Sequence, residues 1–522
     1  MPAQPTRVLT TIEHLLAAAS LFPDREAYVE PATDARERRT VTFGQLAAST
    51  PQLSEAFARR GLRAGDVLAL VLQSSIDYAR CYLAAQWLGA VTTGMNPRLG
   101  STQMAELLER CAPALTIVED DLEQQFGGNV LQRSVLGTLP TSSTRPAYLA
   151  EPDEPVAIVW TSGTTARPKG ALFSHRCLDA VVAGVDVLGA AGDIRLSPLP
   201  FSHVGYMTRV ASEMALGIST VITPTPWSAA SAISVLSSER VTVAQGVPTQ
   251  WALMLDHPSL NTAELSRLRV AGTGAAKMPA SRVEALRNAL KVPVIVRYTS
   301  TESSLGCGTL PGDPDDVVAM TVGRPVAGVE LDLCDDLGHS VDRGEVGNVR
   351  LRTNAAMLGY VSRVVRGPET STIEMDEELT RAAKSDDGWI STSDLGRLDE
   401  LGNLELVGRR HELFQRGGYN IYPAEVEEAL RTLSAVKDAC VVGAPDEILG
   451  EVGVAFVVPT DPSLRPTIAE IRQELSPLIA DYKRPDVLVV VDQIPVTAML
   501  KVDRNALKPA AEEAAQKRRR PV

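Results

Sequence analysis

Residues 161–170 bring together the chemical groups that proteins use to bind phosphate. They read TSGTTARPKG and follow the apolar run VAIVW, which is typical of a buried strand. Small residues let backbone N–H groups approach an anion closely, hydroxyls add donors, and Arg167 and Lys169 add positive charge. The order Lys169-Gly170 excludes a Walker A loop, in which Ser or Thr follows Gly-Lys. On these residues alone, a phosphate-binding loop and a polar surface turn both remain open.

Two other segments end an apolar run in small or polar residues. Residues 294–302 read VIVRYTSTE, so a predicted strand is followed by an aromatic ring, hydroxyls and a carboxylate. Open α/β sheets bind ligands at the carboxyl ends of their strands, which makes Tyr298, Thr301 and Glu302 candidate binding residues. Residues 269–276 read RVAGTGAA, and their glycines permit a close approach to a flat ligand, although this signal is weak by itself.

Three single side chains could do chemistry, and each has an ordinary alternative. Asp394, within GWISTSDLG, can accept hydrogen bonds from two vicinal hydroxyls, and is otherwise a turn residue. His203, within PLPFSHVGY, is otherwise a core or surface histidine. Lys501, within PVTAMLKVDR, is otherwise a solvated loop lysine. For these three residues, only the presence of the other segments in the same sequence favours a chemical role.

In this order, the segments resemble the signature motifs of the adenylate-forming superfamily, which comprises acyl-CoA synthetases, nonribosomal peptide adenylation domains and firefly-type luciferases. The resemblance covers nearly the whole chain, and GGYNIYPAEVE at residues 417–427 is more similar to acyl-CoA synthetases than to peptide synthetases. It implies that ATP activates a carboxylic acid to an acyl-adenylate with release of pyrophosphate, and that the acyl group is then transferred to coenzyme A. The implied cofactors and co-substrates are ATP, Mg²⁺ and coenzyme A.

The resemblance also implies roles for individual residues. The residues that would bind ATP and AMP are Thr161, Ser162, Gly163, Thr164, Thr165, Lys169, Gly274, Ala275, Ala276, Tyr298, Thr299, Asp394 and Arg409. The catalytic residues would be Lys501, His203, Thr301 and Glu302, with Mg²⁺ held by Glu302 and Thr161. The residues that would line the acyl pocket are Val204, Gly205, Val247, Gly272, Ser300 and Ser303. The coenzyme A tunnel would pass His203, Gly417 and Gly418, and the hinge would be His411.

Four positions depart from the family's motifs. Thr299 and Ser393 stand where the family has glycine, so we expect strain at Thr299 if its backbone is left-handed. Leu500 replaces a glycine and His411 replaces a hinge Asp or Lys. These two substitutions keep open a second interpretation, an adenylating enzyme that hands acyl-AMP to a carrier protein or a partner enzyme. A third is a degenerate nucleotide-binding protein, which would release no acid-dependent pyrophosphate.

The motifs leave the identity of the acid open. Fatty, aryl and bulky cyclic acids all fit the resemblance. The small residues Gly205, Gly272 and Gly274 indicate room in the acyl pocket. No basic residue of the motifs is obviously placed for a second carboxylate of the substrate, and no acidic residue for an amino group.

The elements that position these segments alternate between strands and helices. Residues 67–72 read VLALVL, which is typical of a parallel strand covered on both faces, and residues 76–88 form a predicted buried helix. We predict an α/β fold with a large N-terminal domain of two parallel-sheet αβ subdomains and a small β subdomain, followed by a small mobile α+β C-terminal domain. The predicted boundaries are 1–408 for the ATP- and acyl-binding domain and 409–522 for the domain with the catalytic lysine, with the hinge near residue 411.

The composition limits the remaining possibilities. The chain has 522 residues and a formal net charge of −13, which argues against nucleic acid as the main partner, because phosphate backbones bind basic surfaces. Six cysteines are scattered without metal-ligand or disulfide spacing, and no secretory h-region or membrane-length apolar span occurs. We therefore expect a cytoplasmic protein without a membrane span, whose partner is a small-molecule carboxylic acid. A homodimer is expected only by analogy.

Overall fold

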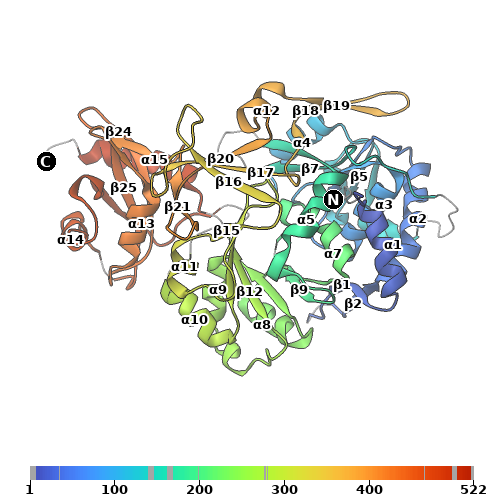
Figure 1. Cartoon of the computed structure of the whole chain (residues 1–522), viewed down its shortest axis with the longest axis horizontal. Helices are drawn as coiled ribbons and strands as arrows, with labels where there is room; N and C mark the ends of the chain where they lie inside the picture. The colour runs from blue at the N-terminus through green and yellow to red at the C-terminus, as the bar shows by residue number, and fades with distance from the viewer. Residues whose placement is uncertain are drawn as a thin grey trace, which may run out of the picture. The chain divides into compact units, whose positions relative to one another are not determined.

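The computed structural model divides the chain into two compact units, each with a hydrophobic core of its own. Figure 1 shows the chain coloured from its N-terminus to its C-terminus. The larger unit contains Met1–Leu331 and Leu351–Ile390, and the smaller unit contains Asp332–Arg350 and Ser391–Val522. The residues that the structure describes are 7–33, 36–138, 146–161, 168–197, 199–274, 278, 280–463, 465–496 and 502–518.

One sheet of the larger unit is built around a run of parallel strands. From edge to edge its strands are β15 (Arg324–Pro325), β14 (Cys307–Gly308), β13 (Val294–Tyr298), β12 (Val270–Gly274), β11 (Val243–Gly246), β9 (Ile194–Ser197), β10 (Ser219–Ile222), β1 (Glu26–Glu30) and β2 (Arg39–Thr42). The strands from β13 to β1 are parallel to their neighbours, whereas β14, β15 and β2 pair in the antiparallel direction. Ligands of such sheets bind beyond the carboxyl ends of the parallel strands.

A second sheet of the larger unit changes from parallel to antiparallel pairing at β7. Its strands, in spatial order, are β19 (Ser371–Met375), β18 (Gly359–Arg366), β8 (Lys169–Ser174), β7 (Pro155–Thr161), β4 (Val91–Gly94), β3 (Val67–Val71), β5 (Leu115–Val118) and β6 (Val130–Gln132). The strands from β7 to β6 are parallel, and those from β7 to β19 are antiparallel. Every residue of β3 is buried, which confirms the strand predicted from its apolar run.

Helices follow most of the parallel strands, as the alternating pattern predicts. The α-helices of the larger unit are α1 (Thr11–Leu21), α2 (Phe43–Arg59), α3 (Ile76–Leu88), α4 (Ser101–Cys111), α5 (His175–Gly184), α6 (Val204–Met207), α7 (Val210–Leu216), α8 (Ala229–Ser238), α9 (Pro248–Leu255), α10 (Ala280–Leu290), α11 (Asp315–Met320) and α12 (Glu377–Ala383). Its 3₁₀ helices are η1 (Asp120–Gln125), η2 (Arg133–Thr138), η3 (Asp186–Leu188) and η4 (Pro258–Thr262). Helix α3 has the predicted bounds and is buried on nearly all sides, as its apolar sequence requires.

The smaller unit is an α+β structure. Its main sheet has the order β23 (Tyr419–Ile421), β22 (Phe414–Arg416), β25 (Gly450–Pro459) and β24 (Val436–Asp446), with β26 (Val487–Val490) parallel to β25. Its helices are α13 (Pro423–Arg431), α14 (Ile468–Glu474), η5 (Asp481–Lys483) and α15 (Arg504–Arg518). Another sheet has the order β16 (Val329–Cys334), β17 (Gly347–Thr353), β20 (Trp389–Leu398) and β21 (Leu404–Arg409). The boundaries between the two units lie within its strands β16, β17 and β20. The predicted α/β class, with a large N-terminal and a small C-terminal part, is confirmed.

Two further properties concern the length of the helices and the state of the cysteines. Among the described residues, no helix is both long enough and apolar enough to cross a membrane. All the cysteines are buried free thiols, namely Cys81, Cys111, Cys177, Cys307, Cys334 and Cys440.

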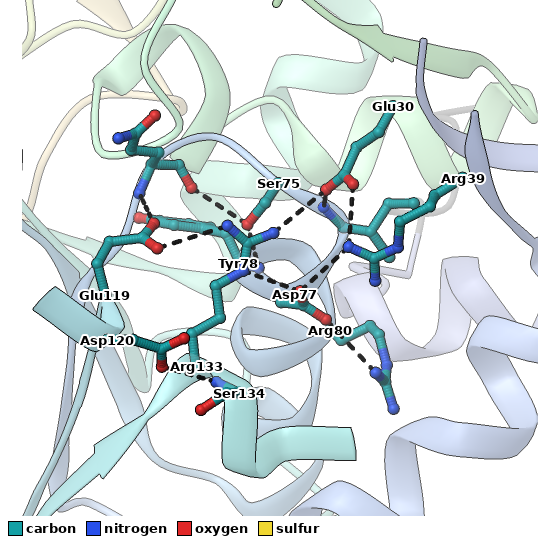
Figure 2. Close-up of polar contacts among 12 residues, drawn as sticks. Glu30, Arg39, Ser75, Asp77, Tyr78, Arg80, Glu119, Asp120, Arg133 and Ser134 are labelled. Atoms are coloured by element: carbon teal, nitrogen blue, oxygen red, sulfur yellow. Dashed lines mark hydrogen bonds and ion pairs between the residues drawn. The ribbon is translucent and has the colours of Figure 1, made fainter. Parts of the chain in front are cut away.

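An ion-pair network centred on Arg133 joins the two sheets of the larger unit (Figure 2). Its guanidinium lies 3.0 Å from a carboxylate oxygen of Asp77 in α3, 3.5 Å from Glu119 after β5 and 3.6 Å from Glu30 at the end of β1. Arg39 of β2 lies 3.1 Å from Glu30. Each of the side chains around Arg133 is less than one-fifth exposed. Arg133 therefore contributes to charge compensation at all three carboxylates, together with Arg39 at Glu30 and Arg80 at Asp77.

We expect Arg133→Met to lower the free energy of unfolding by about 3 kcal/mol, because it removes the cation that three partly buried carboxylates share. Arg59→Met is the control, since Arg59 is 56% exposed and forms a surface ion pair with Glu55; its cost should stay below about 0.5 kcal/mol. Equilibrium unfolding in urea measures both values. Equal, small effects of the two substitutions would contradict a structural role for the network.

His175, the first residue of α5, is a buried histidine. It is 4% exposed, and its Nδ1 atom has no hydrogen-bond partner among the described residues. Burial lowers the pKa of His175 to about 4, and Glu13 opposes this shift only partly. The folded state therefore holds this imidazole in its neutral form at pH values where an exposed histidine is already protonated.

The stability of the protein is expected to fall as the pH falls from 7 to 5. The unfolded chain protonates this histidine near pH 6.5, whereas the folded chain does so only near pH 4, so the unfolded state gains protons first. The contribution of His175 over this window is about 2 kcal/mol. His175→Leu should flatten the dependence of the unfolding free energy on pH by that amount. His339→Leu, at an exposed position, should leave it unchanged, and equal slopes in both variants would refute the assignment.

Candidate active site

The hairpin of β7 and β8 holds the two ends of the hydroxyl-rich segment. Thr161 lies opposite Lys169 in its antiparallel register. Next to Thr161, the indole nitrogen of Trp160 donates a hydrogen bond to Thr93 at 2.8 Å, and the guanidinium of Arg110 lies 5.1 Å from the indole ring. Four predicted binding residues of this segment lie outside the described part of the chain, namely Ser162, Gly163, Thr164 and Thr165. Hydrogen-bonded strands thus fix both ends of the segment.

The carboxylate of Glu302 is held by a tyrosine whose importance was not evident from the sequence. The hydroxyl of Tyr360 in β18 donates a hydrogen bond to Glu302 Oε1 at 2.6 Å. The Nζ atom of Lys169 lies 5.4 Å from the ring centroid of Tyr360. Burial, and secondarily the charge of Glu302, raise the pKa of Tyr360, so its hydroxyl remains a donor. One tyrosine therefore contacts both the lysine of the hairpin and the carboxylate that follows β13.

A turn closed by two serines presents Thr301 and Glu302. The backbone N–H of Ser303 donates to the hydroxyl of Ser300 at 3.1 Å, and the N–H of Ser300 donates to the hydroxyl of Ser303 at 3.2 Å. Tyr298, the last residue of β13, is 8% exposed. Ser303 is fully buried, so its side chain supports the turn. The sequence places Thr301 and Glu302 between these two serines, and the turn fixes their backbone.

Two positions where the family has glycine differ in backbone conformation. Thr299 is not among the described residues with positive φ, so the strain expected for a left-handed threonine does not arise. Ser393 has a φ of 62°, in the left-handed region. A side chain in that region costs about 1 kcal/mol relative to glycine. The departure that carries strain is therefore Ser393.

The glycines expected to leave room for the acid are packed against neighbouring atoms. A Cβ atom at Gly274 would lie 2.5 Å from a main-chain oxygen of β13. The corresponding atom at Gly205 would lie 2.6 Å from Leu199, and at Gly272 it would lie 3.2 Å from Leu188. Glycine at these positions permits close packing of the protein with itself. These glycines are therefore explained by packing, and the expected room in the acyl pocket stays a prediction.

An aromatic cluster fixes the segment that carries His203. The rings of Phe201 and Tyr206 stack with their centroids 3.6 Å apart, and both are buried. Between them, His203 is the N-cap residue of α6, and its Nδ1 atom accepts a hydrogen bond from the N–H of Gly205 at 3.2 Å. Val204 is 5% exposed. The sequence reasoning singled out the histidine but not the aromatic pair that positions it.

In the smaller unit, Asp394 and Arg409 form an ion pair. They lie opposite each other on the antiparallel strands β20 and β21, and Arg409 Nε is 3.1 Å from Asp394 Oδ1. Asp394 is 8% exposed, whereas the side chain of Arg409 is 48% exposed. A carboxylate held in this way presents acceptor oxygens in a fixed direction, which suits a pair of vicinal hydroxyls.

The predicted hinge residue and two of the predicted tunnel residues lie in turns of the smaller unit. His411 follows β21, and burial lowers its pKa, an effect that Glu412 opposes. Gly417 and Gly418 form the two-residue turn between β22 and β23, with φ values of 57° and 84°. Two consecutive positive φ values match a type I′ hairpin turn, which favours glycine at both positions.

The remaining predicted residues are Val247, Ala275, Ala276 and Lys501. Val247 precedes α9, and its backbone N–H donates to Gln250 at 3.0 Å. The other three, with Leu500, lie outside the described residues.

The oxygen atoms of Glu302 and Thr161 suit a Mg²⁺ ion that is also coordinated by the phosphates of a ligand. Among the described residues, no group of three or more His, Cys, Asp or Glu side chains could hold a metal ion. Mg²⁺ is commonly bound by one or two carboxylates together with substrate phosphates and water. Glu302, oriented by Tyr360, can supply such a carboxylate, and Thr161 an oxygen.

Comparisons with known proteins agree with this arrangement. The family model described as AMP-binding enzyme matches residues 15–361, and that of the AMP-binding enzyme C-terminal domain matches residues 425–501. A methyl-dioxo-octahydroindenyl-propanoyl:CoA ligase of Mycobacterium tuberculosis is 31% identical over 93% of this chain and 96% of its own. Indoleacetate–CoA ligase of Aromatoleum aromaticum is 29% identical over 93% and 96%. The structure of the anthranilate CoA ligase AuaEII with anthranoyl-AMP has a TM-score of 0.84 at 26% identity and covers 99% of this chain and 100% of its own.

We expect Tyr360→Phe to weaken the use of Mg²⁺ and ATP, because Glu302 loses the donor that orients it. A hydrogen bond to a charged group contributes about 1.5–3 kcal/mol, so KM for ATP at limiting Mg²⁺ should rise roughly tenfold or more. Excess Mg²⁺ should restore part of the activity. Tyr148→Phe is the matched control, since Tyr148 donates to Glu154 at 3.3 Å. Unchanged kinetics of Tyr360→Phe would exclude the positioning role.

Proposed function

Because this chain belongs to the AMP-binding enzyme family, we propose that it is an AMP-forming acid–thiol ligase, which activates a carboxylic acid with ATP and transfers the acyl group to coenzyme A. The observation that carries the proposal is the joining of Lys169 and Glu302 through Tyr360, beside the segment whose residues suit a phosphate. A lysine and a carboxylate at one point are what a phosphate with its Mg²⁺ requires.

The first half-reaction requires compensation of negative charge rather than proton transfer. A carboxylic acid is already ionised near pH 7, so no general base is required. Its oxygen attacks the α-phosphorus of ATP, the bond to pyrophosphate breaks, and an acyl-adenylate remains. The barrier is the approach of an anion to a polyanion, which Lys169, the hydroxyl-rich segment and Lys501 lower by supplying donors and positive charge. Mg²⁺ bound with ATP neutralises further charge.

The second half-reaction forms the thioester. The sulfur of coenzyme A attacks the carbonyl carbon of the acyl-adenylate, the bond to AMP breaks, and AMP leaves. A free thiol is only a few per cent ionised at pH 7, so a site that excludes water and favours the thiolate accelerates this step. His203, held at the start of α6, and the turn of Gly417 and Gly418 are the residues we place beside the coenzyme A tunnel.

The remaining roles are those that the matching motifs of the family imply for the residues of this chain. Tyr298 stacks on adenine, Thr301 binds the α-phosphate, and Asp394 with Arg409 binds the ribose. We place the domain boundary at 408–409. The small domain then rotates about His411 between one pose for adenylation and another for thioester formation.

The acid we propose carries a ring. The names of the two relatives and of the solved structure describe indene, indole and anthranilate groups, which are all cyclic. Straight-chain fatty acids are the second class to be tested.

The cytoplasm is the location we propose. All the cysteines are free and buried, which suits a reducing compartment. A carrier protein is the alternative acceptor of the acyl group, and the oligomeric state we propose is a homodimer, by analogy alone.

Pyrophosphate release from ATP, measured against a panel of cyclic and straight-chain acids with and without coenzyme A, tests the function. We expect release that requires the acid and continues over many turnovers only when coenzyme A is present. Glu302→Gln should lower the rate about 100-fold, because the carboxylate for Mg²⁺ is lost. Glu330→Gln is the control, since Glu330 pairs with Arg352 and is 60% exposed.

Two other outcomes would contradict the proposed ligase activity. Release limited to one equivalent per enzyme and unaffected by coenzyme A would point to an adenylating enzyme that awaits a carrier protein. Nucleotide binding without any acid-dependent release would overturn the proposal.

A further inference from the structure

The register of the sheet that contains β9 determines which side chains share each of its faces. Arg195 of β9 is paired with Val243 of β11, and Gln245 of β11 is paired with Gly272 of β12. Side chains two residues apart on a strand point to the same face, and paired residues of adjacent strands do so too. Arg195, Gln245 and Gly272 therefore lie on one face.

The same argument adds another arginine to this face. Gly274 lies two residues after Gly272 and is paired with Arg297 of β13. The guanidinium of Arg297 lies 2.9 Å from Asp186 of η3. Leu188 of η3 contacts the position of Gly272, so η3 covers this face. The face that carries the predicted acyl-pocket residue Gly272 thus also carries two arginines.

Arg195 and Arg297 each have a carboxylate partner. Arg195 lies 3.5 Å from Glu213 of α7, and both side chains are only 3% exposed. Arg297 has Asp186. Two cations and two anions are in balance here, so these groups alone leave no excess charge.

Arg209 breaks this balance. It directly precedes α7, is half-buried, and lies one helical turn before Glu213. Its guanidinium makes no hydrogen bond and no ion pair with the residues that the structure describes. Residues four apart on a helix are neighbours, so Arg209 lies beside Glu213, which is 3.5 Å from Arg195. Burial, then the charges of Arg195 and Arg297, lower the pKa of Arg209 to about 10, and the charge of Glu213 opposes this shift. Arg195, Arg209 and Arg297 thus share the carboxylates of Glu213 and Asp186, which leaves an excess of one positive charge among these groups at neutral pH.

We propose that Arg209 binds a second carboxylate of the substrate, so that the preferred acids are dicarboxylic. The inference rests on the proposed function, because it concerns the acid that this site activates. Arg209 follows His203 by six positions, through α6, and lies one helical turn from Glu213, the carboxylate partner of Arg195 on the face of Gly272. A carboxylate would neutralise the excess charge and accept two parallel hydrogen bonds from the guanidinium. A ketone or an alkyl group would leave the charge uncompensated.

The test compares cyclic and straight-chain dicarboxylic acids with their monomethyl esters, which keep one reacting carboxylate and lose the second charge. We expect kcat/KM of the unaltered protein to be roughly tenfold or more higher for at least one diacid than for its half ester. Arg209→Gln should bring this ratio to about one, mainly by raising KM for the diacid. Arg209→Lys should keep part of the preference, because the charge remains and the paired hydrogen bonds are lost.

Arg80→Gln is the control, since Arg80 is also half-buried and lies 3.6 Å from Asp77 of its own helix, α3. It should leave the ratio unchanged, and thermal unfolding of each variant shows whether the fold is retained. The inference is overturned if no diacid is preferred over its half ester, or if folded Arg209→Gln keeps the preference. In both cases, activation of the half esters would leave the proposed function intact, whereas a protein that activates no acid would refute that function itself.

Discussion

The antiparallel pairing of β8 with both β7 and β18 is the constraint on which the candidate site depends. On one side of β8, this pairing sets Lys169 opposite Thr161, and on the other it sets Ala171 opposite Tyr360. The hydroxyl of Tyr360 then reaches Glu302, which follows β13 of the other sheet. A slip of one residue would turn Tyr360 to the opposite face and break this bond. The site therefore exists because two sheets with separate strand orders meet at one tyrosine.

Local sequence was a good guide wherever one segment determines its own structure. Helix α3 has the predicted bounds, and β3 ends one residue before the predicted apolar run does, because burial on all sides leaves a continuous signal. Segments such as residues 294–302 were recognisable because their chemistry is concentrated in a few adjacent residues.

The features that sequence could not predict arise between distant segments. Tyr360 and Glu302 are separated by 58 positions, and no local pattern distinguishes this tyrosine from others in strands. The packing of Gly205 was not predicted, because the side chain of Leu199 comes to lie beside it only in the folded structure. Thr299 drew attention through its comparison with glycine, yet its backbone avoids the left-handed region, while Ser393 occupies it. In each case the answer depends on a neighbour or a backbone angle that the residue type does not encode.

The burial of every cysteine has a consequence for the selectivity of a thioester-forming enzyme. An acyl-adenylate is a strong acylating agent, and any accessible thiolate would compete with the thiol of the incoming co-substrate. Burial raises the pKa of Cys111, Cys307 and Cys440 to about 12, so these groups stay protonated as well as shielded. The protein thus offers its own intermediate no sulfur nucleophile. Self-acylation on cysteine is excluded by the packing of the core, and no separate protective device is required.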